Sequence, residues 1–249
     1  MDTTLQSPRT QDYAAYTPTD YRIWRLLAQR QMDALKPVAA PEYLHCLREL
    51  YPILSPEHPP RFSDLNRALR EAHGWSIEVV KGFLPVDEFF GLLSRRRFCS
   101  STWLRNEQQL DYLEEPDMFH DIFGHIPLYL NQEYADFAQK LGALGVRHAA
   151  DEEKITQLQR LYWFTIEFGV LRDTAGEVKV YGAGICSSPQ ETRHVFENGD
   201  VEILPFDLDQ VMEQTFVIDQ VQMRYFAVDS FAALYAAADE LETRWGAGE

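Results

Sequence analysis

Two histidines and one glutamate are the residues of this sequence best suited to hold a metal ion. His120 and His125 lie in EEPDMFHDIFGHIP, and Glu167 lies in LYWFTIEFGVL. Two imidazoles five residues apart are separated by roughly 140° on a regular helix, so they share no face. Gly124 and Pro127 can bend or end a helix, and such a distortion would let both imidazoles reach one ion. The spacing alone is more typical of two unrelated core or surface histidines.

Glu167 is expected to be buried. The residues three and four positions away on a helix are all apolar: Trp163, Phe164, Val170 and Leu171. A buried carboxylate is costly unless it pairs with a cation, so Glu167 needs either a metal ion or an arginine such as Arg160. Two imidazoles and a carboxylate form the facial ligand set of non-haem Fe(II) oxygenases, which leaves positions open for oxygen and water. The same side chains also form catalytic zinc sites, so a metallohydrolase is a competing hypothesis.

Composition and charge narrow the class of protein. The 249 residues are 45% hydrophobic, as expected for one large globular domain. A formal net charge of -16 makes nucleic acid and anionic membrane poor partners. The segment MDTTLQSPRTQDY does not resemble a signal peptide, and no apolar run is long enough to cross a bilayer. Cys46, Cys99 and Cys186 are scattered and form no CxxC pair, which favours a reducing cytoplasm.

The pattern of apolar residues predicts a mainly α protein with a few short β-strands. Residues 1–19 are polar and are interpreted as a flexible or surface-draped leader, followed by one domain over 20–249. Helices are predicted from a cap at Asp20 to Pro37, over 41–51, from a cap at Ser63 to Gly74, over 85–96, 131–144 and 151–172, through Arg193 and Phe196, and from Ser230. Strands are predicted over 75–80 and 178–181 and near Phe216 and Tyr225, and a loop is predicted at GAGICSSP.

Three ordered segments resemble one known family. PDMFHDIFGHIP resembles the iron-binding signature of the pterin-dependent aromatic amino acid hydroxylases, LYWFTIEFG resembles the segment that supplies their glutamate ligand, and VYGAGICSSPQE resembles their substrate-side loop. The resemblance extends from about Asp20 to Phe231. It implies a single-domain helical basket with the iron in its cavity. Because the chain has no room for the regulatory domain or the tetramerisation helix of animal members, it is expected to be a monomer, most like the bacterial members.

The resemblance assigns roles to particular residues. It implies that His120, His125 and Glu167 bind iron, and that Arg105 in STWLRN holds the carboxylate of the amino acid substrate, a task that suits a planar guanidinium. The residues that it places around the substrate are Pro116, Trp163, Phe168, Gly184 and Ser187. The residues that it places beside the pterin are Gly82, Phe83, Leu84, Phe89 and Asp121. Phe89 also fits a plain core position of an amphipathic helix, and Leu113 and Phe216 depart from the threonine and tyrosine of animal members.

The implied activity is that of a monooxygenase. It would use Fe(2+), tetrahydrobiopterin or a related tetrahydropterin, and O2 to hydroxylate L-phenylalanine to L-tyrosine, the first step of phenylalanine catabolism. Trp163 matches a position that is tryptophan in the phenylalanine enzymes and a smaller phenylalanine in those acting on tyrosine and tryptophan. Ile218 matches an aspartate of the tyrosine enzymes. A binding protein that has lost turnover is a further, non-enzymatic alternative.

Overall fold

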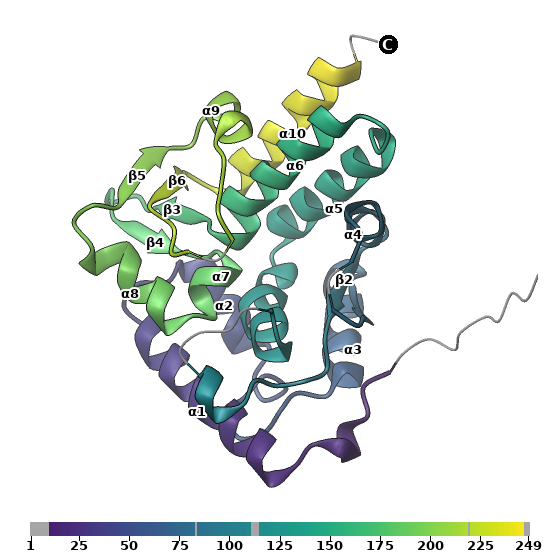
Figure 1. The fold of residues 1–249 in the computed structure, drawn as a ribbon, viewed down its shortest axis with the longest axis vertical. Coiled ribbons are helices and arrows are strands. Elements are labelled where there is room, and N and C mark those ends of the chain that lie inside the picture. The colour runs from purple at the N-terminus through teal and green to yellow at the C-terminus, as the bar shows by residue number, and fades with distance from the viewer. Residues whose placement is uncertain (1–9, 83, 111–114, 219, 247–249) are drawn as a thin grey trace, which may run out of the picture.

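Helices make up most of the computed structural model, which describes residues 10–82, 84–110, 115–218 and 220–246 (Figure 1). The α-helices are α1 (Pro18–Leu35), α2 (Pro41–Glu49), α3 (Phe62–His73), α4 (Val86–Ser94), α5 (Gln132–Arg147), α6 (Glu152–Tyr162), α7 (Ala183–Cys186), α8 (Pro189–Glu197), α9 (Leu208–Glu213) and α10 (Phe231–Gly246). Short 3-10 or π-helical segments are η1 (Tyr13–Ala15), η2 (Glu107–Gln109), η3 (His120–His125), η4 (Ile126–Leu130) and η5 (Trp163–Glu167). The predicted mainly helical fold with a few short strands is confirmed.

Local signals account for most helix ends. At α1 the cap is Thr17, whose hydroxyl accepts from the backbone N–H of Asp20, while the Asp20 carboxylate accepts from the N–H of Thr17. The prediction of Asp20 as the cap was therefore wrong by three residues. Helix α3 begins at Phe62, so Ser63 is not its cap, but it ends as predicted at Gly74, whose φ of 75° lies in the left-handed region.

Residues 10–17 lie on the surface of the domain. The Tyr13 hydroxyl donates to the carbonyl of Pro59 at 2.9 Å, and the Tyr16 hydroxyl donates to the carbonyl of Thr102 at 2.8 Å. Hydrogen bonds to segments 46 and 86 residues away hold this part of the chain in place. Helix α1 then begins at Pro18, two residues before the expected boundary.

Two small sheets complete the fold. Strands β1 (Ser76–Val79) and β2 (Arg97–Ser100) pair in parallel. The second sheet has the order β4-β3-β6-β5, formed by β3 (Val170–Arg172), β4 (Val178–Val180), β5 (Glu202–Pro205) and β6 (Arg224–Val228), in which only β3 and β4 are antiparallel. The strands predicted at 75–80, at 178–181 and near Tyr225 are confirmed. The strand predicted near Phe216 is wrong, because that residue lies in the loop between α9 and β6.

The predicted helix over 151–172 is correct only to Glu167. Val170 and Leu171 instead pair with β4 on one side and β6 on the other, where both are buried. β-branched and apolar residues fit such a buried pleated surface, and the tertiary pairing overrides the helical pattern. The structure also contains β2, β5 and α9, which had not been predicted, and the predicted loop at GAGICSSP includes the short helix α7.

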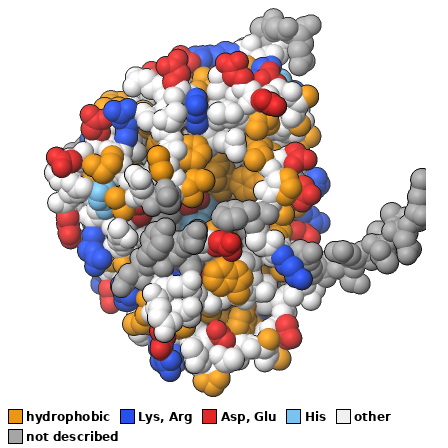
Figure 2. All heavy atoms as spheres, in the orientation of Figure 1, with side chains coloured by type: hydrophobic (Ala, Val, Ile, Leu, Met, Phe, Trp, Pro, Cys, Tyr) orange, Lys and Arg blue, Asp and Glu red, His pale blue; other side chains and the backbone are white. Residues whose placement is uncertain are grey.

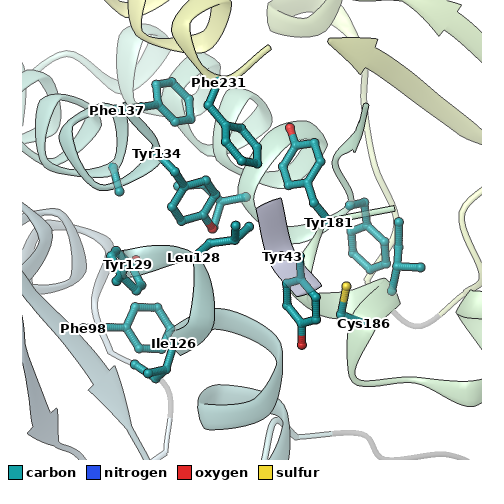
Figure 3. Packing of buried hydrophobic residues seen from close by; sticks show 14 of the residues in the cluster. Tyr43, Phe98, Ile126, Leu128, Tyr129, Tyr134, Phe137, Tyr181, Cys186 and Phe231 are labelled. Atoms are coloured by element: carbon teal, nitrogen blue, oxygen red, sulfur yellow. The ribbon is translucent and has the colours of Figure 1, made fainter. Parts of the chain in front are cut away.

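The core is closely packed where α5 meets its neighbours. Tyr134 of α5 lies edge-on to Phe231 of α10 at 5.4 Å between ring centroids, and Tyr181 contacts the same ring at 5.0 Å (Figure 3). A Cβ atom at Gly142 would lie 2.2 Å from the backbone N of Ser94, at the end of α4. The absence of a side chain at Gly142 therefore allows α4 and α5 to approach closely, and α4 forms one wall of the site described next.

Candidate metal centre and active-site cavity

A π-helical segment brings His120 and His125 to the same face of the chain. The π-helix η3 extends from one histidine to the other. In this geometry the backbone hydrogen bond spans five residues instead of four, so side chains five residues apart approach one another. The two Nε2 atoms are 3.2 Å apart. The local distortion predicted around Gly124 and Pro127 is thus present, and it takes the form of a π-helix followed by the 3-10 segment η4.

Glu167 completes the cluster from a second π-helical segment. It is the last residue of η5, which continues α6 toward the sheet. Its Oε1 lies 3.4 Å from Nε2 of His120 and its Oε2 lies 3.2 Å from Nε2 of His125. Metal–ligand bonds of about 2.1 Å place neighbouring donor atoms roughly 3.0–3.4 Å apart, for angles from octahedral to tetrahedral. The three side chains therefore fit around one ion, but these distances do not distinguish iron from zinc.

The alternative pairing of Glu167 with Arg160 is not what the structure contains. The Arg160 guanidinium donates to the backbone carbonyl of Met212 at 2.7 Å, on α9. The Glu167 carboxylate faces the two imidazoles instead, with 13% of its side chain exposed.

Hydrogen bonds fix the proton position on His120. The Ser187 hydroxyl donates its hydrogen to the carbonyl of Ala183 at 2.8 Å, so its oxygen must accept from Nδ1 of His120 at 2.9 Å. Nε2 of neutral His120 then carries a lone pair that faces the two carboxylate oxygens of Glu167 and Nε2 of His125. All these donor atoms lie within 4.8 Å of one another. Three side chains that direct their donor atoms at one point suit a metal ion, which would be held between them.

The protonation states agree with that arrangement. Burial lowers the pKa of His120 to about 4, which leaves its imidazole neutral at pH 7. Burial by itself would raise the pKa of Glu167, but the adjacent His120 and His125 more than offset this and lower the pKa below its usual value. Neutral imidazole and ionised carboxylate are the forms that bind metal ions.

A largely apolar cavity of about 300 Å³ opens above the cluster. His120, His125 and Glu167 contribute to its lining, and Figure 2 shows a hollow with mostly hydrophobic walls on this face of the molecule. Six other residues predicted for the site also line it: Gly82, Leu84, Phe89, Pro116, Asp121 and Trp163. Phe83 and Leu113 lie outside the described residues.

Comparison with known proteins places the chain in a family. The sequence model of the Biopterin-dependent aromatic amino acid hydroxylases matches residues 6–242. The chain belongs to this family. It is 42% identical over 201 residues to the phenylalanine-4-hydroxylase of Ralstonia nicotianae and 40% identical over 201 residues to that of Chromobacterium violaceum. These matches cover 81% of the chain but only 63% and 66% of the two relatives.

Solved structures of the hydroxylase family have the same fold. The Chromobacterium violaceum phenylalanine hydroxylase with bound Fe(III) matches with a TM-score of 0.89 at 40% identity, over 93% of this chain and 83% of that one. A second structure of that enzyme, with Fe(III) and 7,8-dihydrobiopterin, matches with a TM-score of 0.89 at 38% identity, over 97% and 87% of the two chains. The predicted family and its catalytic-domain fold are confirmed.

Four of the described residues predicted for the site do not line the cavity: Arg105, Phe168, Gly184 and Ser187. Phe168 packs against Trp163, with 4.7 Å between ring centroids. A Cβ atom at Gly184 would lie 2.8 Å from the Phe168 ring and 2.9 Å from Oε1 of Glu167. Ser187 is 3% exposed and contacts His120, as described above. Gly184 and Ser187 therefore both touch the metal cluster, a relation that sequence reasoning had missed.

Arg105 is buried and engaged by a partner that was not predicted. Its Nε and Nη2 each donate to Asp117 at 2.9 Å, one to either carboxylate oxygen, and its backbone N–H also donates to Asp117 at 2.9 Å. Asp117 further accepts from the backbone N–H of His120 at 3.1 Å. Nη1 and one hydrogen of Nη2 are not used by these bonds. Asp117 lies in the same PDMFHD segment as His120, and this position was the available signal.

The predicted pterin side of the cavity contains both polar and aromatic groups. The Asp121 carboxylate accepts from the backbone N–H of Ser101 at 2.8 Å, and burial raises its pKa to about 8. Phe89 lines the cavity and lies edge-on to Tyr162 at 5.0 Å, so it is more than a core residue of α4. Tyr162 and Gln159 also line the cavity and had been missed, although their spacing of three on α6 places them on one face.

Proposed function

We propose that the chain is a phenylalanine 4-monooxygenase, which converts L-phenylalanine to L-tyrosine with O2 and a tetrahydropterin at a mononuclear non-haem Fe(II) site. The observation that carries the proposal is the cluster of His120, His125 and Glu167 at an apolar cavity. Family membership supports iron over zinc at this cluster, and the relatives named above are phenylalanine hydroxylases. The reaction would be the first step of phenylalanine catabolism.

The three ligand residues have one shared task. When bound, iron and a tetrahydropterin together supply the activation of O2 for insertion into an aromatic ring. His120, His125 and Glu167 hold the metal with three side chains, and each of them also lines the cavity. Ser187 keeps the lone pair of His120 directed at the metal by accepting from Nδ1. Small molecules can therefore reach the metal through the cavity.

The substrate would bind with its polar end toward Arg105 and its ring against the aromatic wall. In this proposal, the N–H groups of Arg105 that Asp117 does not use hold the substrate carboxylate, and Asp117 holds the guanidinium in place. Gly184 and Ser187 close this end of the site. Pro116, Trp163 and Phe168 pack around the ring and exclude water, as an apolar pocket with a few polar groups does.

The pterin would occupy the opposite side of the cavity. We assign Gly82, Phe83 and Leu84 to the backbone segment beside its ring, and Phe89 to stacking on it. Asp121 is the polar group at this side, held by the N–H of Ser101. Gly82 and Leu84 line the same cavity as the metal cluster, which supports one continuous site for pterin and substrate.

Phenylalanine is proposed as the preferred aromatic amino acid. Trp163 narrows the ring end of the cavity against the indole of tryptophan. Ile218 also lines the cavity with an apolar side chain, but 70% of its surface is exposed, so a tyrosine hydroxyl beside it could still bond to water. A tyrosine hydroxyl left unpaired against the buried part of the apolar wall, formed by residues such as Trp163, would cost roughly 1–3 kcal/mol, enough for about tenfold to hundredfold discrimination.

The remaining predictions concern partners, cellular location and assembly. Within the described ranges, no helix has both the length and the apolar character needed to cross a bilayer. The net charge of -16 disfavours nucleic acid, and the proposed partners are small molecules. Cys46, Cys99 and Cys186 are all free thiols, in agreement with the proposed cytoplasmic location. The monomeric state stays a prediction, and light scattering would test it.

One reconstitution experiment tests the proposal. The protein is loaded anaerobically with Fe(II), then given a tetrahydropterin, O2 and each aromatic amino acid, and the products are identified. We expect tyrosine from phenylalanine, with dependence on both pterin and O2. Loading with Zn(II) should give no hydroxylation, and hydrolytic activity with zinc in the absence of O2 would favour the metallohydrolase instead.

Variants of the ligand residues test the metal site itself. His120→Ala, His125→Ala and Glu167→Ala should each lose most of the bound iron, measured by metal analysis after gel filtration, and nearly all hydroxylation. His45→Ala, at an exposed position of α2, is the matched control and should keep both. Full iron content and activity in any one of the three variants would remove that residue from the ligand set.

A further inference from the structure

Gln222 is a buried amide behind the aromatic wall of the cavity. It lies between α9 and β6 with 6% of its surface exposed. Its Oε1 accepts from the indole N–H of Trp163 at 3.0 Å. Its Nε2 donates to the backbone carbonyls of Val217 at 3.0 Å and of Gln220 at 2.8 Å. The side chain therefore joins Trp163 to the loop between α9 and β6.

Only one orientation of this amide satisfies its partners. The indole N–H is a donor and the two backbone carbonyls are acceptors, so Oε1 must face Trp163 and Nε2 must face the loop. A flipped amide would place donor against donor and acceptor against acceptors. All three hydrogen bonds depend on this one orientation, in which the amide connects the loop to the indole.

The backbone of Gln222 is anchored independently of its side chain. Its carbonyl accepts from Nε2 of His194 on α8 at 3.0 Å. Its backbone also forms a hydrogen bond to the Glu191 carboxylate, which in turn accepts from the Tyr225 hydroxyl at 2.9 Å. Helix α8 and strand β6 therefore hold Gln222 in place. An amide held in this way can determine the position of Trp163 instead of following it.

The position of Trp163 determines which atoms face the cavity. Its ring stacks on Phe216 with 4.3 Å between centroids and 13° between planes, and it packs against Phe168 on another side. Both Trp163 and Phe216 line the cavity, and so does Ile218 in the same loop. Because the only donor of the indole is used by Gln222, its carbon atoms remain to face an apolar substrate ring. A rotated indole would leave its N–H unpaired in apolar surroundings.

We propose that Gln222 is a positioning residue that sets the width of the ring end of the cavity, and thereby the selectivity for phenylalanine over tryptophan. It does so by holding Trp163 and the loop that carries Phe216 and Ile218. This inference rests on the proposed function. Gln222 itself lines no part of the cavity, so its effect on substrates passes through these aromatic and apolar side chains.

Gln222→Met tests the role because methionine has a similar length but neither donates nor accepts in place of the amide. We expect the ratio of kcat/KM for phenylalanine to that for tryptophan to fall roughly fivefold to tenfold, the size of one lost hydrogen bond. Iron content should not change. Gln210→Met makes the same replacement at an exposed position of α9 and should leave the ratio unchanged. An equal loss of kcat/KM for both amino acids in Gln222→Met would show general structural support and overturn the proposal.

A double-mutant cycle separates the action through Trp163 from other effects. Trp163→Phe removes the indole donor, so adding Gln222→Met in that background should change the selectivity ratio by less than twofold. The same fivefold to tenfold change in both backgrounds would overturn the proposed route through Trp163.

A measurement without turnover distinguishes failure of this inference from failure of the proposed function. The protein is labelled with 15N at its indole groups and loaded with Zn(II), which is diamagnetic, and the indole N–H signals are recorded by NMR. The signal of Trp163 is the one that is missing from the spectrum of Trp163→Phe. In Gln222→Met this signal should shift and its N–H should exchange faster with water. An unchanged signal would overturn the inference even if the enzyme hydroxylates phenylalanine. If the wild type hydroxylates no aromatic amino acid, the proposed function and the selectivity role of Gln222 fail together. Even then, the indole signal of Trp163 reports whether Gln222 holds Trp163 in place.

Discussion

Gly184→Ala should weaken iron binding without unfolding the protein. The added Cβ would lie 2.9 Å from Oε1 of Glu167 and 2.8 Å from Cζ of Phe168, whereas ordinary contacts begin at 3.4 Å. The carboxylate oxygen must therefore withdraw by about 0.5 Å, and metal–ligand distances tolerate only about ±0.2 Å. If α7 moves away instead, the hydrogen bond between Ser187 and His120 is lost. Either response disturbs the metal cluster.

The magnitude follows from the cost of overpacking. Inserting a methyl group into a closely packed site costs about 1–3 kcal/mol. In the metal-free protein the Glu167 side chain can rotate to relieve the contact, so most of this cost falls on the iron-bound state. An affinity loss of about tenfold to hundredfold corresponds to roughly 1.4–2.8 kcal/mol. Hydroxylation at limiting Fe(II) should fall by the same factor and recover in part at high Fe(II).

The assay is an anaerobic titration of the metal-free protein with Fe(II), with the melting temperature measured in parallel. Gly199→Ala is the matched control, because a Cβ there would meet nothing within 4 Å, and it should bind iron like the wild type. Iron affinity within twofold of wild type in Gly184→Ala, with normal activity, would refute the reasoning that α7 packs against the metal cluster.

Three further predictions concern the rest of the molecule. Arg105→Lys should raise the KM for phenylalanine by about tenfold to hundredfold. An ammonium cannot pair with both Asp117 and the substrate carboxylate as a guanidinium does, and the loss of one charged hydrogen bond costs about 1.5–3 kcal/mol. Unchanged kinetic constants would contradict the role in binding the substrate carboxylate. Burial raises the pKa of Glu191 from 4.5 to about 7, so the folded state binds this proton more tightly than the unfolded state and stability should fall as pH rises through that interval. Glu191→Gln should remove about 2–3 kcal/mol of this pH dependence between pH 5 and 8 in urea unfolding, and an unaltered pH profile would contradict it. Gly142→Ala should lower the free energy of unfolding by about 3 kcal/mol, because the added Cβ would collide with the backbone N of Ser94. The measurement is urea unfolding. A urea midpoint equal to that of the wild type would show that α4 can move away freely.

The helices were predictable because their signals are local. Proline at the first turn of α2, Asn131 as the cap of α5 and left-handed Gly74 at the end of α3 are all readable within a few residues of the chain. Errors arose where two local signals competed. Thr17 and Asp20 can both cap a helix, and only the capping box with both side chains engaged decides between them.

The candidate ligands could be named from sequence motifs, but their geometry could not be derived from periodicity. HxxxxH on a regular helix places His120 and His125 on different faces. The π-helix η3 brings the two histidines to one face, but π-helices are intrinsically rare and need support from their surroundings. One such support is the close contact of Gly124 with Ala183 of α7, because a Cβ atom at Gly124 would lie 2.8 Å from the carbonyl oxygen of Ala183. The sequence could therefore indicate that a distortion was needed, but not its form.

By itself, the sequence determined the helical class, most helix boundaries and the side chains that can bind a metal, because each depends on residues within one or two turns of the chain. Only the tertiary structure decided that Val170 and Leu171 leave the helix for a sheet, that Asp117 engages Arg105, and that Gln222 holds Trp163 across 59 residues. Each of these features depends on a partner brought in by folding. A hydrogen bond between distant segments leaves no periodic signal in the chain, since its partners become neighbours only after the helices and strands have packed.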